Sequence, residues 1–290
     1  MLVTGSKGQL GWELSRTCPA NIKIYPVDIG ELDISNGEKV ERYVSDLQPN
    51  WIINAAAYTA VDKAEQESEI AYRVNRDGAE NLALSAKRIS AKLIQISTDF
   101  VFDGKKSSPY LSEDKPNPLC VYGASKQAGD EAVLSILGQQ ATIIRTAWVY
   151  SSHGNNFVKT MLKLMSEREE LGIVADQIGT PTWANGLAKA IWSCLELDEP
   201  NNSESKIYHW TDAGVSSWYD FAIAIQEEAT QLGLLHNDKD CKVYPIRTED
   251  YPTPAKRPAY SVMDKTHISQ ATNIQTQHWR AALRKMLAEL

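Results

Sequence analysis

The first half of the sequence alternates short apolar, β-rich runs with amphipathic stretches, and this alternation restricts the fold more than any other feature. Such a pattern is typical of βαβ units, in which helices cover both faces of a parallel sheet. We therefore expect an α/β fold built on a doubly wound parallel sheet. The predicted strands are 22–28, 51–57, 91–98 and 141–150, and the predicted helices are 35–48, 66–88 and 122–137.

Past residue 150 the pattern becomes less regular. Two segments there predict irregular structure: a solvated turn over 196–205 and a proline-stiffened loop over 251–258. We expect one domain over 1–150 and a smaller mixed α/β domain over 151–290, with segments near 184–210 returning to the first. The helices predicted in the second half are 155–168, 184–197, 217–232 and 277–289, and the strands are 171–175, 206–210 and 242–246.

Charge and composition exclude several classes of function. The formal net charge of −7 over 290 residues argues against a protein whose main task is to hold nucleic acid. No apolar run approaches the roughly 20 residues of a membrane-spanning helix, and no signal peptide follows Met1. We therefore expect a cytoplasmic protein without a membrane partner. Four widely spaced cysteines are interpreted as reduced thiols: Cys18, Cys120, Cys194 and Cys241.

The N-terminal stretch MLVTGSKGQLGWELSR places Gly5, Gly8 and Gly11 between an apolar stub and an amphipathic helix. Glycines there let the backbone turn tightly towards a pyrophosphate, and the helix N-terminus offers its N–H groups. Asp28 comes 23 residues after Gly5, at the end of the next predicted strand, where a ribose-binding carboxylate is expected. A structural turn with a capping aspartate is the alternative, but this context favours a Rossmann-type dinucleotide site. Only four residues precede Gly5, so a native start a few residues upstream would lengthen the first strand.

The segment YGASK places Tyr122 and Lys126 four residues apart, on one face of a predicted helix. Thr98 ends a predicted strand, where open α/β sheets bind their ligands. A carbonyl that receives hydride needs a proton, and a tyrosine with a pKa of about 10 is a poor donor unless a nearby ammonium favours its phenolate. Taken singly, the three residues could equally be a core tyrosine, a solvated lysine and an ordinary strand end.

Together these motifs resemble the extended short-chain dehydrogenase/reductase family. The resemblance covers nearly the whole chain, and it is closest to the branch that reduces the C4 ketone of dTDP-4-dehydro-L-rhamnose to dTDP-L-rhamnose with NADPH or NADH. It implies that Thr98, Tyr122 and Lys126 are catalytic and that the second domain binds the substrate. The matching stretches are GQLGWEL (8–14), NAAAYTAVDKAE (54–65), STDFVFDG (97–104), NPLCVYGASKQAGDE (117–131), RTAWVY (145–150), GNNFVKTML (154–162), DQIGTPT (176–182) and YPTPAKRPAYSVMD (251–264).

The resemblance also implies further contacts. Asp99 and Trp148 are expected to touch the sugar beside Thr98, and Arg257 lies on a loop that closes over the substrate side. Two positions depart from the family pattern, because Phe100 replaces a common Tyr and Tyr58 a common His. The implied cofactor contacts, besides Gly5, Gly11, Tyr122 and Lys126, are Gly8, Gln9 and Leu10 at the pyrophosphate, Asp28, Asp33 and Ile34 around the adenosine, and Ala57, Tyr58, Thr59 and Ile96 along the rest.

The family includes magnesium-linked dimers, so the resemblance implies a homodimer. Glu13 fits the metal pattern, but Asn185 occupies the place of another carboxylate. We therefore assign no metal-ligating residue and leave Mg²⁺ open.

The same fold also serves other functions. Sugar-nucleotide dehydratases of this fold carry Thr-Asp-Glu where this chain has Thr98-Asp99-Phe100, and phenylalanine cannot move a proton, so elimination is disfavoured. A sugar-nucleotide epimerase or another reductase of the family remains open, as does a non-catalytic regulatory subunit that binds NADP. Intact Thr98, Tyr122 and Lys126 argue against the regulatory subunit.

Overall fold

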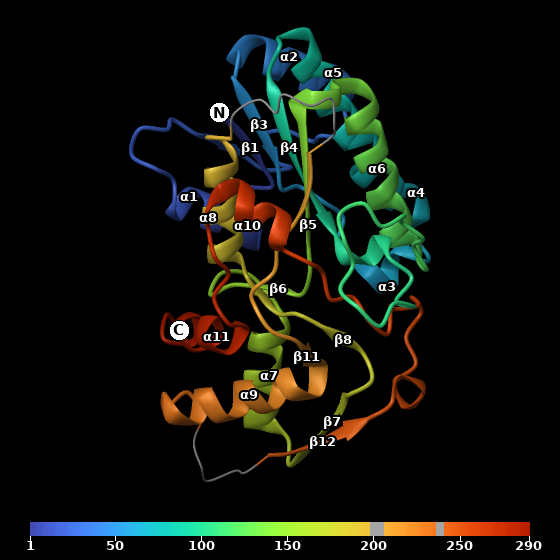
Figure 1. Ribbon diagram of the computed structural model, residues 1–290, viewed down its shortest axis with the longest axis vertical. Coiled ribbons are helices and arrows are strands. Elements are labelled where there is room, and N and C mark those ends of the chain that lie inside the picture. The colour runs from blue at the N-terminus through green and yellow to red at the C-terminus, as the bar shows by residue number, and fades with distance from the viewer. Residues whose placement is uncertain (198–205, 236–240) are drawn as a thin grey trace.

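A computed structural model describes residues 1–197, 206–235 and 241–290. In this part of the chain the central sheet has six strands, all parallel, in the order β10-β5-β4-β3-β1-β2 (Figure 1). The predicted fold class is confirmed. The strands are β1 (Leu2–Thr4), β2 (Tyr25–Val27), β3 (Trp51–Asn54), β4 (Lys92–Thr98), β5 (Ala141–Thr146) and β10 (Lys206–His209).

Helices cover both faces of this sheet, as expected for strands that read as continuous apolar runs. One face packs against α2 (Gly37–Leu47), α5 (Gly78–Arg88) and α6 (Val121–Leu137). The other face packs against α1 (Gln9–Arg16), α8 (Ala184–Cys194) and α10 (Thr266–Thr272). Figure 1 shows the two layers on opposite sides of the strands. The second layer therefore comes largely from the second half of the chain, as does the edge strand β10.

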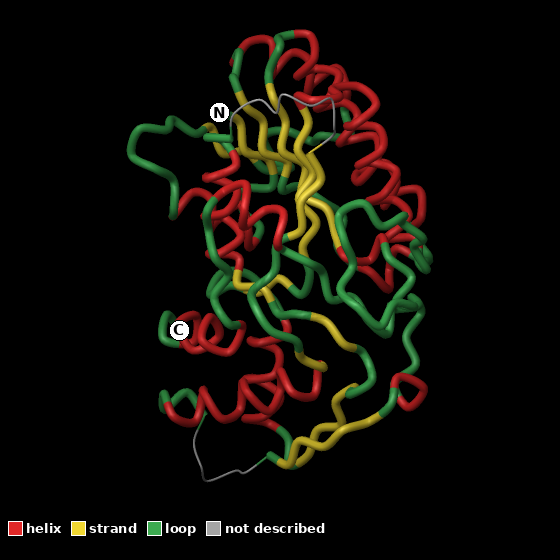
Figure 2. The backbone as a smooth tube through the Cα atoms, viewed as in Figure 1, coloured by secondary structure: helices red, strands yellow, loops and turns green. Residues whose placement is uncertain are grey.

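A second core lies beyond the carboxyl ends of the sheet strands (Figure 2). It is built from α7 (Phe157–Glu167), α9 (Trp218–Gln231) and α11 (Trp279–Leu287). Three short strand pairs connect these helices to the first core. They are β7 (Glu170–Val174) with β12 (Lys242–Ile246), β8 (Ile178–Gly179) with β11 (Ser216–Ser217), and β6 (Val149–Tyr150) with β9 (Thr182–Trp183).

The structure corrects two predicted elements. The strand predicted over 141–150 is interrupted between β5 and β6, because Trp148 adopts a left-handed backbone with φ +48°. The helix predicted over 66–88 consists of α4 (Ser68–Tyr72), a π-helical turn over Arg73–Asp77, and α5. The short helix α3 (Val61–Ala64) and the helix α10 were not predicted.

Three further sequence predictions concern loops, cysteines and membranes. The segment 251–258 is a loop, as predicted, whereas most of the turn predicted over 196–205 lies outside the described residues. No disulfide joins the cysteines in the described part of the chain, as expected for reduced thiols. Within the same residues, no helix is both long enough and apolar enough to cross a membrane.

Candidate active site

A cleft of about 640 Å³ opens at the carboxyl ends of β1, β3, β4 and β5 and is flanked by α6. Ligands are expected at this edge of an open parallel sheet. The cleft brings together residues that lie more than 100 positions apart in the sequence. The predicted site residues that line it are Gly8, Gln9, Leu10, Ala57, Thr59, Ile96, Thr98, Asp99, Tyr122, Lys126 and Trp148.

The glycine loop shapes one end of the cleft. Gly5 has a left-handed backbone with φ +68°, and a Cβ there would stand 2.6 Å from the backbone nitrogen of Ala56. A Cβ on Gly11 would stand 2.2 Å from the carbonyl oxygen of Gly5. These two glycines therefore allow the turn itself, whereas Gly8 begins α1 without a side-chain cap and lines the cleft. The first N–H groups of α1 remain available to an anion.

The three residues expected around an adenosine lie outside the cleft lining. Asp28 accepts a hydrogen bond from the backbone N–H of Lys7 at 2.8 Å, which ties the end of β2 to the glycine loop. Asp33 accepts from the backbone and hydroxyl of Ser35, at 3.0 and 2.7 Å. Ile34 is buried in the core against α5. Asp28 and Asp33 stay partly accessible beside the loop, but Ile34 serves packing.

Tyr58 follows β3, between the cleft residues Ala57 and Thr59. Its hydroxyl donates to Glu67 at 2.5 Å, so the side chain turns away from the cleft. Its backbone N–H donates to the side-chain oxygen of Asn75 at 2.8 Å, and the Asn75 amide in turn donates to the hydroxyl of Ser125 on α6. Asn75 lies in the π-helical turn, and no local sequence pattern predicted that turn.

Thr98 and Tyr122 lie next to each other in the cleft. The 3₁₀ turn over Asp99–Val101 begins at Thr98, whose hydroxyl accepts from the backbone N–H of Phe100 at 3.2 Å. The ring of Phe100 meets Tyr122 edge-on, with centroids 5.5 Å apart. Burial raises the pKa of Tyr122 well above its ordinary value, and the Thr98 hydroxyl opposes this shift. We expected a nearby ammonium to favour the phenolate of Tyr122, but Lys126 is not among the groups that shift this pKa, and burial has the largest effect.

Lys126 is 2% exposed, and its ammonium group donates to the carbonyl oxygen of Ile96 at 2.6 Å. Burial lowers the pKa of Lys126, whereas the nearby carboxylate of Asp130 raises it. Asp99 is equally buried and accepts from the Thr98 hydroxyl at 3.1 Å. Burial raises the pKa of Asp99 to about 6. The cleft therefore holds several ionisable groups whose protonation is controlled by burial.

Trp148 lines this cleft, and Trp218 lines a neighbouring groove of about 570 Å³. Its indole stacks on Trp218 with ring centroids 3.6 Å apart and an angle of 8° between the planes. A Cβ on Gly179 would stand 2.7 Å from the same indole, so the ring fits only above a glycine. The groove runs between α7 and the β7–β12 pair. Its polar and aromatic lining includes Arg168, Trp218, Tyr244, Tyr251 and Arg257.

Arg257 lines this groove and not the cleft. Its guanidinium pairs with both carboxylate oxygens of Asp62, at 3.0 and 2.7 Å, and the hydrogen bonds from Arg257 lower the pKa of Asp62. Because Asp62 follows the cleft residue Val61 in α3, this pair fastens the 251–258 loop to the rim of the cleft. The sequence placed Arg257 on this loop but gave no sign of its partner.

Residues that the sequence argument did not assign also line the cleft. Asn156 begins α7, and its amide donates to Gln9 at 2.9 Å, so it joins the second core to the glycine loop. The motif GNNFVKTML contains Asn156, but nothing in its pattern reveals a contact with a residue so distant in the sequence. Phe100 borders Tyr122 and was noted only as a departure from the family pattern.

The candidate metal residue Glu13 is fully buried. Its carboxylate accepts from Arg16 at 2.8 Å, from Asn185 at 2.9 Å and from Ser151 at 3.3 Å. Arg16 also binds Glu289 at 3.0 Å, so one guanidinium offsets both carboxylates. No group of three His, Cys, Asp or Glu side chains in the described residues could hold a metal ion. Side chains of the chain itself therefore hold the Glu13 carboxylate.

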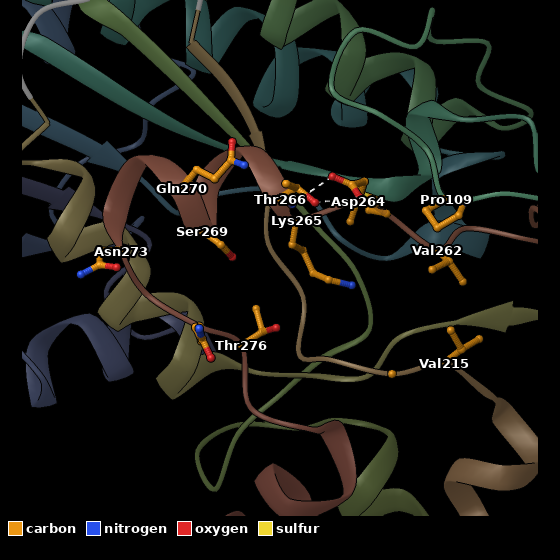
Figure 3. Close-up of a pocket in the computed structure, with 13 residues that line it drawn as sticks. Pro109, Val215, Val262, Asp264, Lys265, Thr266, Ser269, Gln270, Asn273 and Thr276 are labelled. Carbon is orange, nitrogen blue, oxygen red and sulfur yellow. Dashed lines mark hydrogen bonds between the residues drawn. The ribbon is translucent and has the colours of Figure 1, made fainter.

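A larger cavity, of about 690 Å³, is lined by a different set of residues (Figure 3). It lies between Lys265–Asn273 on one side and Gly214 and Val215 on the other. Asp264 turns back to accept from Thr266, which leaves Lys265 as the charged side chain reaching into the space in Figure 3. No candidate catalytic residue lines this cavity, so its size does not make it the active site.

Comparison with known proteins gives matches over the whole chain. The family model described as the RmlD substrate binding domain matches residues 1–290. The dTDP-4-dehydrorhamnose reductase of Aggregatibacter actinomycetemcomitans is 45% identical, and the alignment covers 99% of this chain and 98% of that protein. The spore coat polysaccharide biosynthesis protein SpsK of Bacillus subtilis is 40% identical, covering 100% and 97%.

Solved structures agree with these matches. The dTDP-4-dehydrorhamnose reductase of Bacillus anthracis in complex with NADP superposes with a TM-score of 0.91 at 37% identity, covering 100% of this chain and 98% of that chain. The UDP-glucose 4-epimerase of Thermotoga maritima, at 18% identity and a TM-score of 0.80, shares the fold alone.

Proposed function

Because this chain belongs to the dTDP-4-dehydrorhamnose reductase family, we propose that it reduces the C4 ketone of dTDP-4-dehydro-L-rhamnose to dTDP-L-rhamnose with NADPH or NADH. The observation that carries this proposal is the convergence of Thr98, Tyr122 and Lys126 on one cleft that also receives the glycine loop. If Tyr122 and Lys126 served packing alone, there would be no reason for Thr98 and the glycine loop to meet them in one cleft.

Each residue of the trio has a distinct role. Tyr122 is protonated at neutral pH, since burial raises its pKa, and its hydroxyl would give that proton to the oxygen of the reduced ketone with help from a positive charge that offsets the phenolate. The Thr98 hydroxyl lies beside it and hydrogen-bonds the same oxygen as negative charge develops there. The Lys126 ammonium would stabilise the phenolate that remains after transfer, and it would also contact the cofactor in the cleft.

The chain offers a site of suitable chemistry for the cofactor, which supplies the hydride when bound. The uncapped N-terminus of α1, with Gly8, Gln9 and Leu10, would hold the pyrophosphate. Asp28 and Asp33 would face the adenosine side, with Ala57, Thr59 and Ile96 along the cleft floor. Ile34 and Tyr58 would only support these neighbours, because the Ile34 side chain is buried in the core and the Tyr58 hydroxyl binds Glu67. Lys7, 3.7 Å from Glu31, is available to offset a 2′-phosphate beside Asp28, so both NADH and NADPH would work.

The sugar nucleotide would extend from the cleft into the neighbouring groove. Asp99 and Trp148 border the place of the sugar, and Trp218, Tyr244 and Arg257 offer aromatic and cationic surfaces to the nucleotide. In this division, residues 1–150 hold the cofactor and 151–290 hold mainly the substrate. The segments near 184–210 return to the first unit, as the pairing of β10 with β5 supports.

We also propose an assembly and a location for the protein. A homodimer rests on the family resemblance, and light scattering tests it. A cytoplasmic location is supported by cysteines that form no disulfide in the described chain.

The decisive experiment is the oxidation of NADPH followed at 340 nm with dTDP-4-dehydro-L-rhamnose as substrate. A reductase consumes NADPH in proportion to the dTDP-L-rhamnose formed. An epimerase or a regulatory subunit would bind the cofactor without consuming it, and that outcome would refute the proposed function. NADH is tested in parallel, and its kcat/KM is expected to lie within about tenfold of that for NADPH, or roughly 1.4 kcal/mol.

A further inference from the structure

The helix α6 carries a third ionisable residue on the face of Tyr122 and Lys126. Asp130 follows Lys126 by four residues, so the three side chains lie in one row along the helix. Asp130 is 3% exposed, and one of its oxygens accepts from the hydroxyl of Ser97. The other oxygen has no hydrogen-bond partner among the described residues. A buried carboxylate held in this way is costly for the fold, and an asparagine would occupy the same space without a charge.

The charged groups around Asp130 affect its protonation and that of Lys126. Lys126 from the same helix and Arg145 from β5 are the positive groups that act on Asp130, and the neighbouring Glu131 is the negative one. Burial raises the pKa of Asp130 to about 6, so it is ionised at neutral pH. For Lys126, burial favours the neutral amine, and Asp130 is the group that opposes this effect. The negative charge of Asp130 thus favours the ammonium form of Lys126.

Asp130 also fixes the helix against the strand that carries Thr98. Lys126 binds the carbonyl of Ile96, and Asp130 binds the hydroxyl of Ser97. These are the two residues of β4 directly before Thr98, so α6 and β4 are fastened together where the candidate catalytic groups face each other.

We propose that Asp130 is a positioning residue of the reduction, which holds Lys126 in its charged form and sets the distance between α6 and Thr98. This role rests on the proposed function of Tyr122 and Lys126 but is tested without turnover. The experiment is a pH titration of the protein labelled with ¹³C at lysine Cε, in which the signal of Lys126 is identified by its loss in Lys126→Met.

In Asp130→Asn the midpoint of the Lys126 titration should fall by about one to three pH units, the usual effect of an opposite charge at close range. Asp212→Asn is the matched control, because Asp212 is also a buried aspartate with a raised pKa, but Asp130 and not Asp212 is the charge that acts on Lys126. It should leave the midpoint unchanged. In the wild-type protein the Lys126 signal should also show a small second inflection near pH 6, where Asp130 gains its proton. That inflection keeps the proposal testable if Asp130→Asn does not fold.

A double-mutant cycle then links the charge to catalysis. Asp130→Asn should lower kcat in the wild-type background and have little further effect in Lys126→Met, because it acts through the lysine. An unchanged Lys126 midpoint, or an equal loss in both backgrounds, would show that Asp130 is only structural. Absence of turnover in the wild-type protein would instead refute the proposed function, while the titration still decides the role of Asp130.

Discussion

At the scale of single residues, burial sets the protonation of the cleft as much as the identity of its side chains does. Burial raises the pKa values of Tyr122 and Asp99 and lowers that of Lys126, so it favours the neutral form of all three. A protonated tyrosine beside a threonine is ready to donate, and the difficulty lies in the phenolate that remains. An ammonium on the next turn of the helix is well placed to reduce that difficulty.

Two variants separate the donor from the charge. Tyr122→Phe deletes the hydroxyl but keeps the ring against Phe100, so the protein should fold and bind NADPH while kcat falls about 10²- to 10⁴-fold. Lys126→Met should weaken NADPH binding and move the alkaline limb of the reverse, oxidative reaction to higher pH. Steady-state kinetics and NADPH titrations measure both effects. Retention of more than about a tenth of wild-type turnover by Tyr122→Phe would remove its catalytic assignment.

Asp212 gives a pH effect on stability that is independent of catalysis. It is 3% exposed, and burial raises its pKa to about 7 from the 3.8 expected in the unfolded chain. The protonated form therefore favours folding, and this stabilisation is complete below about pH 4 and lost as the pH rises through 7. Asp212→Asn should be more stable than wild type at pH 8 by roughly 1–3 kcal/mol and show no such gain at pH 4.5. Urea unfolding at the two pH values measures the difference, and equal gains at both would contradict the pKa assignment.

At the scale of elements, the tryptophan stack offers a test of the boundary between cleft and groove. Trp148→Ala should raise the KM for the sugar nucleotide about 3- to 10-fold, because it removes an aromatic surface from the substrate path. Gly179→Ala should act in the same direction, since its Cβ would displace the Trp148 indole. NADPH affinity, measured by fluorescence titration, should change little in either variant. A parallel loss of NADPH binding would make Trp148 a core residue instead.

Local patterns predicted most regular elements, but tertiary contacts decided the exceptions. The apolar run over 91–98 and the amphipathic run over 122–137 became β4 and α6 almost residue for residue. The break at Trp148 arises because its side chain stacks on Trp218, 70 residues later, and no local rule places a tryptophan in a left-handed conformation. The same holds for the residues of the site. The position of Thr98 could be predicted because it ends a strand, whereas the pairing of Arg257 with Asp62 depends on contacts between segments far apart in the sequence.

At the scale of the whole molecule, the ion pairs of Arg16 with Glu13 and Glu289 join α1 to the chain end after α11. We expect EDTA to leave the Tm of the wild-type protein unchanged. Arg16→Ala would leave the buried Glu13 without its counter-ion and should cost roughly 2–4 kcal/mol, somewhat less than for a fully buried pair because the Arg16 side chain is 35% exposed. Thermal unfolding with and without EDTA or MgCl₂ tests this. A Tm that falls on chelation would show that a divalent cation belongs to the protein.

The pairing of β10 with β5, and the covering of one sheet face by α8, have a consequence for synthesis on the ribosome. β10 begins about 60 residues after β5 ends, so it leaves the exit tunnel about 60 residues later than β5 does. At roughly 5–20 residues per second, the growing chain spends several seconds with β1 to β5 made and this sheet face covered only by α1. That face carries Ile53, Ile94 and Ile144, which α8 later buries. Nascent chains stalled between these points should therefore recruit chaperones, whereas those released after α8 and β10 should not.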